Sequence, residues 1–427
     1  MRIEVICTGD EVLTGKIVNT NFAFISQRLE DVGLSVAWET TVGDDRESLL
    51  RAFQLAGERA DAVIVNGGLG PTVDDLSQEV AAQAAGVELA LNDEWLTKME
   101  DFFRRRSRVM PPNNRKQALL PTTAEIIDNP IGTACGFAVD IGHARFFFTP
   151  GVPRELKRML EEQIVPRLLA KSGLQTAIHL KRFHSYGLGE SHVDALLSGV
   201  EALVPDGSVK LGFRAHYPQL ETKLTARGRD MDDIRAKLAP VEAEVRKRLG
   251  NFIMAEDDQT LEGVVLAELT KRQATLAIVE TFTSGQIAAR FAHLPGAEKV
   301  FRRGILARQL GEVCAAVGVD APVGDTTRET AEAVARAARQ QTGATHALAV
   351  LIDLDEGADR IEFGGTICLA IATEDDAASR RSRIVGGREW VRLGAVEMAL
   401  DCLRRYLQGL PVYERTDFEK VEKGTSP

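Results

Sequence analysis

Cysteine is scarce in this 427-residue sequence: Cys7, Cys135, Cys314, Cys368 and Cys402 lie far apart and form no CxxC pair. A disulfide framework or a structural zinc site is therefore not expected, and a reducing cytosol is the expected compartment. Aromatic residues make up only 6% of the chain, and its seven histidines show no metal-ligand spacing such as HExxH.

Long apolar runs are also missing. No stretch approaches the roughly 18 uninterrupted apolar residues of a membrane span, and the first residues do not resemble a secretory signal. The formal net charge of −10 argues against a protein whose main role is to coat nucleic acid. With 44% hydrophobic and 27% charged residues, the composition is that of a globular, cytoplasmic protein of two to three domains.

Short apolar runs alternate with helix-period segments in the first third of the chain. Arg2–Cys7 and Ala60–Val65 are typical of strands, and apolar residues at steps of three or four predict a helix from Asn19 to Gly33. This alternation predicts an α/β domain over residues 1–170, with a doubly wound and mainly parallel sheet. Ligands of such sheets bind at the carboxyl ends of the strands.

The pattern changes after residue 170. Alternation at Thr222, Leu224 and Ala226 predicts a half-exposed antiparallel strand, so we expect a small α+β domain over residues 171–257. We interpret that domain as a spacer or dimerisation unit in preference to an RNA-binding one. A third, Ala-rich α/β domain is expected over residues 258–410, followed by a loose polar tail over residues 411–427.

The loop after the first strand carries two adjacent acids, Asp10 and Glu11, beside Thr8 and Gly9. At the carboxyl end of a strand such carboxylates can bind Mg²⁺ or orient a polyol. The alternative is a purely structural turn in which Thr8 and Asp10 cap the following helix.

A glycine cluster follows the third predicted strand, in the string NGGLGPTVDD over residues 66–75. Its glycines allow a ligand to approach the backbone, and Thr72 stands at a helix N-terminus, which attracts phosphate. The string matches neither a dinucleotide fingerprint nor a Walker loop. Because acids beside phosphate repel it unless a cation intervenes, we interpret the loop as a site for a metal-bridged diphosphate, with a structural turn as the alternative.

Three further polar segments, residues 113–117, 129–134 and 149–153, are of the kind that fixes a nucleotide-like ligand. Arg115 or Lys116 could neutralise phosphate there. We interpret the nearby run Arg104–Arg106 as a solvated helix face.

Five strings in this order, TGDEVLTGKIVNTN, VNGGLGPTVDD, NNRKQALLP, NPIGTACGF and FTPGVPREL, closely resemble the CinA (competence/damage-inducible protein) family. The string GLGES at residues 187–191 resembles the family's KH-like middle domain. The resemblance implies a three-layer molybdopterin-binding-like domain, a KH-like domain and an amidohydrolase-like α/β domain. We expect the protein to form a homodimer and, from its charge and its lack of long apolar runs, to bind neither membranes nor nucleic acid.

For the N-terminal domain, the resemblance implies metal-dependent hydrolysis of ADP-ribose or a related nucleoside diphosphate sugar. The cation would be Mg²⁺, Mn²⁺ or Co²⁺, with K⁺ as a further candidate, and Asp10, Asp74 and Asp75 would hold it. The catalytic residues would be Asp74, Asp75 and Lys116. The substrate-binding residues would be Thr8, Gly9, Asp10, Glu11, Asn19, Asn21, Asp44, Gly67, Gly68, Gly70, Thr72, Asn129, Gly132 and Thr133.

The C-terminal domain of the family hydrolyses the amide of nicotinamide mononucleotide, with a nucleophile loop that reads roughly Glu-Ser-Cys-Thr-Gly-Gly. The corresponding residues here are Glu280, Thr281, Phe282, Thr283, Ser284 and Gly285, so that Thr281 stands in the nucleophile's place. Residues 304–313 contain neither the Tyr nor the Lys that activates the family's serine. We therefore expect a degenerate deamidase site. The alternatives are a bifunctional enzyme that recycles pyridine nucleotides, and a non-catalytic module that binds a molybdopterin or a nucleotide.

Overall fold

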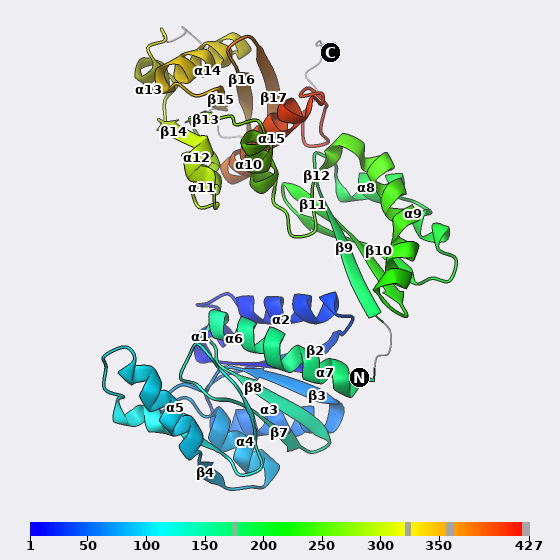
Figure 1. Cartoon of the computed structure of the whole chain (residues 1–427), viewed down its shortest axis with the longest axis vertical. Helices are drawn as coiled ribbons and strands as arrows, with labels where there is room; N and C mark the ends of the chain where they lie inside the picture. Colours follow the sequence, from blue (N-terminus) through cyan, green and yellow to red (C-terminus); the bar gives the residue numbers. More distant parts are fainter. Residues whose placement is uncertain (174–176, 321–325, 356–362, 421–427) are drawn as a thin grey trace. The chain divides into compact units, whose positions relative to one another are not determined.

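The structure, a computed structural model, describes residues 1–173, 177–320, 326–355 and 363–420. The chain forms two compact units. Unit 1 comprises Met1–His179 with Arg229–Met231, and unit 2 comprises Leu180–Gly228 with Asp232–Pro427 (Figure 1). Among the described residues, no helix is both long and apolar enough to cross a membrane.

Unit 1 is built on a six-stranded sheet of order β2-β1-β3-β8-β7-β6, in which β2, β1, β3 and β8 run parallel. The strands are β1 (Ile3–Thr8), β2 (Val36–Val42), β3 (Ala62–Asn66), β6 (Glu125–Ile127), β7 (Gly136–Ile141) and β8 (Ala144–Thr149), with a separate pair β4 (Leu89–Leu91) and β5 (Leu119–Pro121). The helices are α1 (Asp10–Leu13), α2 (Thr20–Asp31), α3 (Arg46–Arg59), α4 (Ser77–Ala85), α5 (Asp93–Arg104), η1 (Pro112–Ala118), α6 (Pro153–Met159), η2 (Leu160–Ile164) and α7 (Val165–Ser172).

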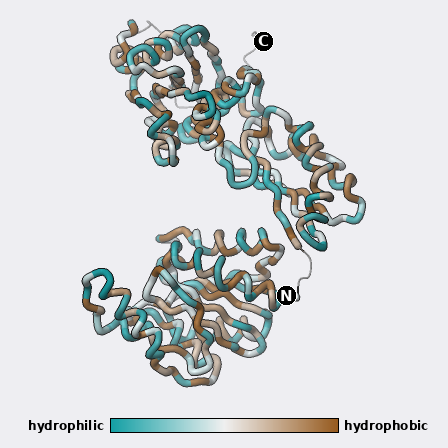
Figure 2. Tube along the Cα trace, viewed as in Figure 1, coloured by the Kyte–Doolittle hydropathy of each residue, from teal (hydrophilic) through white to brown (hydrophobic). Residues whose placement is uncertain are grey.

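Helices cover both faces of this sheet, so that its central strands are buried on each side. Along β1, Val5 and Cys7 pack with α2, α6 and α7, whereas Ile6 packs with α3, α4 and α5. The strands of this sheet are accordingly mostly hydrophobic, whereas the helices contain both hydrophobic and hydrophilic residues (Figure 2). This arrangement confirms the predicted three-layer, mainly parallel architecture.

Unit 2 begins with a four-stranded sheet of order β10-β11-β9-β12, packed with α8 and α9. Its elements are β9 (Ala177–Tyr186), α8 (Glu190–Leu196), η3 (Val200–Leu203), β10 (Val209–His216), β11 (Gln219–Gly228), α9 (Met231–Leu249), η4 (Gly250–Phe252) and β12 (Ile253–Glu256). In β11 every second residue is buried, as the alternation at Thr222, Leu224 and Ala226 predicts.

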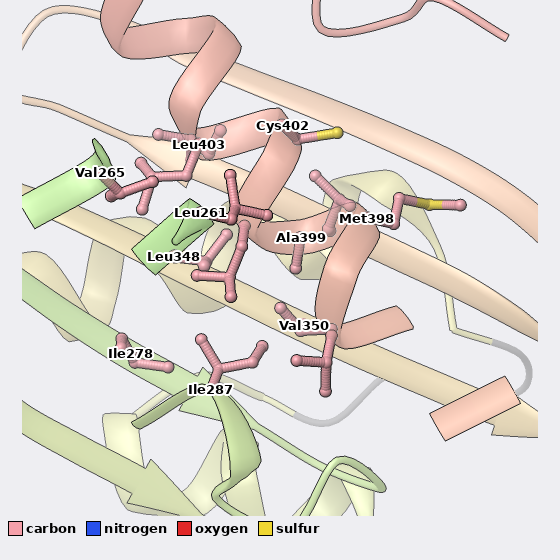
Figure 3. Packing of buried hydrophobic residues seen from close by; sticks show 14 of the residues in the cluster. Leu261, Val265, Ile278, Ile287, Leu348, Val350, Met398, Ala399, Cys402 and Leu403 are labelled. Carbon is pink, nitrogen blue, oxygen red and sulfur yellow. The ribbon is translucent and has the colours of Figure 1, made fainter. Parts of the chain in front are cut away.

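The rest of unit 2 is a five-stranded sheet of order β14-β13-β15-β16-β17, in which β14, β13 and β15 run parallel. Its elements are α10 (Leu261–Lys271), β13 (Leu276–Glu280), α11 (Gln286–Ala292), α12 (Ala297–Val300), β14 (Phe301–Leu306), α13 (Leu310–Val317), α14 (Arg328–Thr342), β15 (His346–Leu354), β16 (Gly364–Ala372), β17 (Ala377–Val385) and α15 (Arg388–Gln408). Helices α10, α11 and α15 pack on one face through residues such as Val265, Ile287 and Leu403, and α13 and α14 cover the other (Figure 3).

The segment after α15 differs from the expected loose tail. In the described part, residues 411–420, Val412 is buried and Glu419 pairs with Arg380. Glu414 likewise pairs with Arg405, which is itself buried. Buried arginines on α15 and β17 need carboxylate partners, and this segment supplies them. Residues 421–427 of the expected tail lie outside the described residues.

A buried ion pair ties β1 to α3 in unit 1. Arg59 donates to both carboxylate oxygens of Glu4, at 2.8 and 2.5 Å, and the Glu4 side chain is only 1% exposed. We predict that Arg59→Met lowers the free energy of unfolding by about 3–5 kcal/mol, because it leaves a buried carboxylate without its cation. Urea unfolding followed by circular dichroism measures this loss.

Arg51→Met on the same helix is the matched control. Arg51 forms an exposed pair with Glu47, so we expect a change below about 1 kcal/mol. Equal losses in the two variants would contradict a special role for the Glu4–Arg59 pair.

Candidate functional site

A pocket of about 430 Å³ lies in unit 1, where β1, β3 and β8 end. This is the edge at which a parallel sheet binds ligands. Predicted site residues that line the pocket are Thr8, Gly9, Glu11, Asp44, Gly67, Gly68, Gly70, Asp74, Asp75 and Thr133.

The glycine loop after β3 approaches the first loop closely. Gly67 has φ 115°, and a Cβ there would lie 2.8 Å from the carbonyl oxygen of Thr8, so only glycine fits without strain. Ser77, at the start of α4, donates to the Gly67 carbonyl at 2.9 Å and fixes the loop. The Thr8 hydroxyl is buried beside the pocket and has no hydrogen-bond partner among the described residues, which makes it available to a ligand.

Five carboxyl groups line this pocket: Glu11, Asp44, Asp74, Asp75 and Glu155. Burial raises the pKa of Asp44, and the neighbouring carboxylates raise it further. Such a pocket favours ligand groups that donate hydrogen bonds, and it accepts an anion only together with a cation.

Asp10 and Asp75, two of the three predicted metal ligands, already have polar partners. Asp10 exchanges backbone-to-carboxylate hydrogen bonds of 3.2 Å with Asp44, and Asp75 accepts from the backbone N–H of Thr72 at 2.8 Å. Among the described residues no three His, Cys, Asp or Glu side chains converge on a point where an ion could bind. The divalent cation, and K⁺ with it, stay a prediction.

Other predicted site residues mainly stabilise the surrounding loops. Asn19 caps α2, and Asn21 donates to Asn66 and to the Gly151 carbonyl. Lys116 donates to the Thr72 carbonyl at 3.0 Å and lies 3.6 Å from Glu79, so its charge is partly neutralised. Asn129 and Gly132 line a neighbouring hollow against α5.

Two further polar residues line the pocket: Gln117, which belongs to the predicted 113–117 segment, and Glu155, which sequence reasoning missed. Gln117 donates to the Leu69 carbonyl at 3.0 Å and accepts from Thr133, which joins the glycine loop to the 129–134 segment. Glu155 accepts from Asn129 at 2.7 Å, and burial raises its pKa. Glu155 lies within the string FTPGVPREL, so attention to every polar residue of that string would have found it.

In unit 2, the loop over residues 281–285 joins β13 to α11 at the corresponding edge of the second parallel sheet. Glu280 ends β13 and is fully buried, and its two carboxylate oxygens accept from the backbone N–H groups of Ile287, at 3.1 Å, and Ala288, at 2.9 Å. A carboxylate at a helix N-terminus satisfies donors that the helix itself leaves free. The loop is thereby fixed at both ends.

Three hydroxyl groups lie in this loop. Thr281, only 3% exposed, accepts from the backbone N–H of Ile352 at 2.9 Å and lies 3.4 Å from the Val350 carbonyl. The hydroxyl of Thr283 is buried and has no partner among the described residues. Ser284 is exposed and donates to the Phe282 carbonyl.

Residues 304–313 lie beside this loop, since β14 pairs with β13 and Ala307 donates to the Glu280 carbonyl. Arg308 places its guanidinium 4.6 Å from the ring centre of Phe282. The loop therefore offers buried hydroxyls, one aromatic face and one exposed cation.

The cysteines are buried; burial raises the pKa of Cys368 to about 11, which fits a packing role.

Comparison with known proteins identifies three consecutive regions. Residues 4–170 match the probable molybdopterin binding domain, residues 181–255 the KH domain of the damage-inducible protein CinA, and residues 258–407 the CinA C-terminal domain. A CinA-like protein of Shewanella sediminis is 39% identical over 96% of each chain. The nicotinamide-nucleotide amidohydrolase PncC of Shewanella oneidensis is 37% identical over 95% of this chain and 96% of its own. The crystal structure of a CinA protein of unknown function from Thermoplasma acidophilum is 33% identical and covers 40% of this chain and 96% of its own, with a TM-score of 0.35.

These findings overturn the expected function. We expected ADP-ribose hydrolysis in the N-terminal domain and an inactive C-terminal deamidase, but a relative aligned along nearly the whole chain is named as an amidohydrolase. The matches reported above do not point to ADP-ribose hydrolysis. The expectation rested on the residues that replace Ser, Cys, Tyr and Lys of the family. The structure retains a hydroxyl at the strand end and a fixed strand-to-helix loop despite these replacements.

Glu155 provides a test of the pocket's electrostatics. Burial raises its pKa, and the hydrogen bond from Asn129 lowers it. We predict that Asn129→Ala raises the pKa of Glu155 further, because the carboxylate loses that donor while it stays half-buried. A ¹³C titration of the glutamate carboxyls, with Glu155→Gln to assign the signal, measures the shift; an unchanged or lower pKa in Asn129→Ala would contradict this account.

Proposed function

Because this chain belongs to the CinA family, we propose that its C-terminal domain hydrolyses the carboxamide of a nicotinamide nucleotide. The observation that carries the proposal is the similarity to the named amidohydrolase along 95% of the chain, which includes the β13–α11 loop. Water and the carboxamide would give the carboxylate of the nicotinate nucleotide and ammonia.

Within the loop, we assign the nucleophile to the Thr281 hydroxyl. Its oxygen would bond to the carboxamide carbon as the C–N bond breaks and ammonia leaves, and water would then hydrolyse the ester and restore the hydroxyl. The N–H of Ile352, 2.9 Å from Thr281 Oγ1, would stabilise negative charge that develops on this oxygen. Because residues 304–313 contain neither Tyr nor Lys, a group of another kind must accept the hydroxyl proton.

Two groups near Thr281 suit a nicotinamide nucleotide. Arg308 can pair with the nucleotide phosphate, and by doing so it can leave the face of Phe282 that it covers to a cationic pyridinium. In unit 1, the acidic pocket, whose Thr8 hydroxyl has no partner in the described part of the chain, remains a predicted binding site for a small molecule, and its site residues and cation are part of this proposal. The homodimer expected from the sequence is also part of this proposal.

The test is release of ammonia from nicotinamide mononucleotide by the full-length protein. We expect Thr281→Ala to reduce the rate by about tenfold or more, because the attacking oxygen is removed. Mass spectrometry of the product should show the nicotinate nucleotide.

Thr342→Ala is the matched control. Thr342 lies on α14 in the same unit and, like Thr281, bonds to a backbone carbonyl, so we expect its rate to stay within about twofold of wild type. No ammonia above the blank would refute the proposed activity, and tight binding without turnover would instead favour a non-catalytic module. Turnover that survives in Thr281→Ala would remove Thr281 from the nucleophile's position.

A further inference from the structure

Helix α11, which fixes one end of the Thr281–Gly285 loop, is attached to its neighbours by Arg290. This side chain donates to Glu262 of α10, with Nε at 3.1 Å, and to Glu397 of α15, with Nη1 at 2.7 Å. One arginine thus joins two helices, α10 and α15, to the helix that binds the Glu280 carboxylate.

Glu397 depends on a partner from the other sheet of unit 2. Its side chain is 3% exposed and burial raises its pKa, so its charged form needs several donors. Arg290 supplies one of them, and Gln219, the first residue of β11, supplies another at 2.6 Å. Gln219, Glu397 and Arg290 therefore form a continuous chain of hydrogen bonds from the β10–β11 hairpin to α11.

The hairpin is closely seated on α15. The ring of Tyr217 stacks on Trp390 with centroids 3.3 Å apart, and its hydroxyl donates to the Trp390 carbonyl at 3.1 Å. A Cβ on Gly394 would lie only 2.5 Å from the Tyr217 hydroxyl oxygen. This close contact holds Gln219 at a fixed distance from Glu397.

We propose that Gln219 is a positioning residue for the Thr281–Gly285 loop: it orients Glu397, which orients Arg290 and thereby fixes α11 against Glu280. The KH-like domain would then control the order of the loop although it contributes no residue to it. That the ordered loop serves catalysis rests on the proposed function, whereas the ordering itself does not.

The experiment is hydrogen exchange of the full chain with Gln219→Met, which keeps the side-chain length and removes the donor. We expect the amides of Ile287 and Ala288, which donate to Glu280, to exchange about fivefold faster or more, while amides in the centre of β16 stay within twofold. A general loss of stability would accelerate both groups alike, so unchanged or uniformly faster exchange would overturn the proposal.

Gln341→Met is the matched control, because Gln341 also donates one side-chain bond, to the Ala316 carbonyl, on the opposite side of the sheet. Its exchange at Ile287 and Ala288 should equal that of wild type. If Gln219→Met does not fold, Gln219→Glu replaces it; this variant has the same shape and places a second carboxylate beside Glu397.

Turnover of nicotinamide mononucleotide separates this inference from the proposed function. In Gln219→Met we expect kcat to fall about threefold or more with KM within twofold, since the loop is disordered but its contacts with substrate are not removed. If Gln219→Met accelerates exchange at Ile287 and Ala288 but the wild-type protein shows no turnover, the positioning role stands and the proposed activity is refuted. Turnover with unchanged exchange would overturn the positioning role alone.

Discussion

The hydrogen bonds between the Glu280 carboxylate and the first free N–H groups of α11 determine the geometry of the loop in unit 2. A buried carboxylate at a strand end has a large desolvation cost, which only strong donors offset. The N-terminus of α11 provides those donors at 2.9 and 3.1 Å. As a result residues 281–285 have few alternative backbone conformations, and their hydroxyls are held at the carboxyl ends of the parallel strands.

In unit 1, the loop between a strand and the next helix is also fixed, but by different groups. β3 ends in the buried Asn66 instead of an acid, glycines follow it, and Ser77 of α4 fixes the turn by donating to the Gly67 carbonyl. The acids are placed instead around the opening, where they line the pocket. The two units therefore differ in charge at equivalent positions of their sheets: one offers carboxylates, and the other offers hydroxyls with an exposed arginine at Arg308. They are suited to different ligands.

Sequence patterns predict the elements whose burial is local and periodic. The runs at β1 and β3 and the alternation in β11 appear as expected because each depends on residues a few positions apart. The motifs also place most of the pocket residues on the correct loops. Glu155 was missed because its role depends on Asn129, which lies 26 residues away on another segment. The inactive deamidase was wrongly expected because the absence of Tyr and Lys from residues 304–313, and the other replacements in the loop, were weighed without the loop geometry that Glu280 imposes.

The contacts between the β10–β11 hairpin and the helices of the second sheet are the least accessible to sequence reasoning. Gln219 and Glu397 are separated by 178 residues, and Glu397 and Arg290 by 107. Two acids, Glu262 and Glu397, share the single guanidinium of Arg290, and Gln219 supplies a further, neutral donor to Glu397. Buried charges of this kind add little net stability, because desolvation cancels most of their attraction. Their directional hydrogen bonds do select one arrangement of α10, α11 and α15. The bond from Gln219 to Glu397 fixes the hairpin of the KH-like domain in the same arrangement.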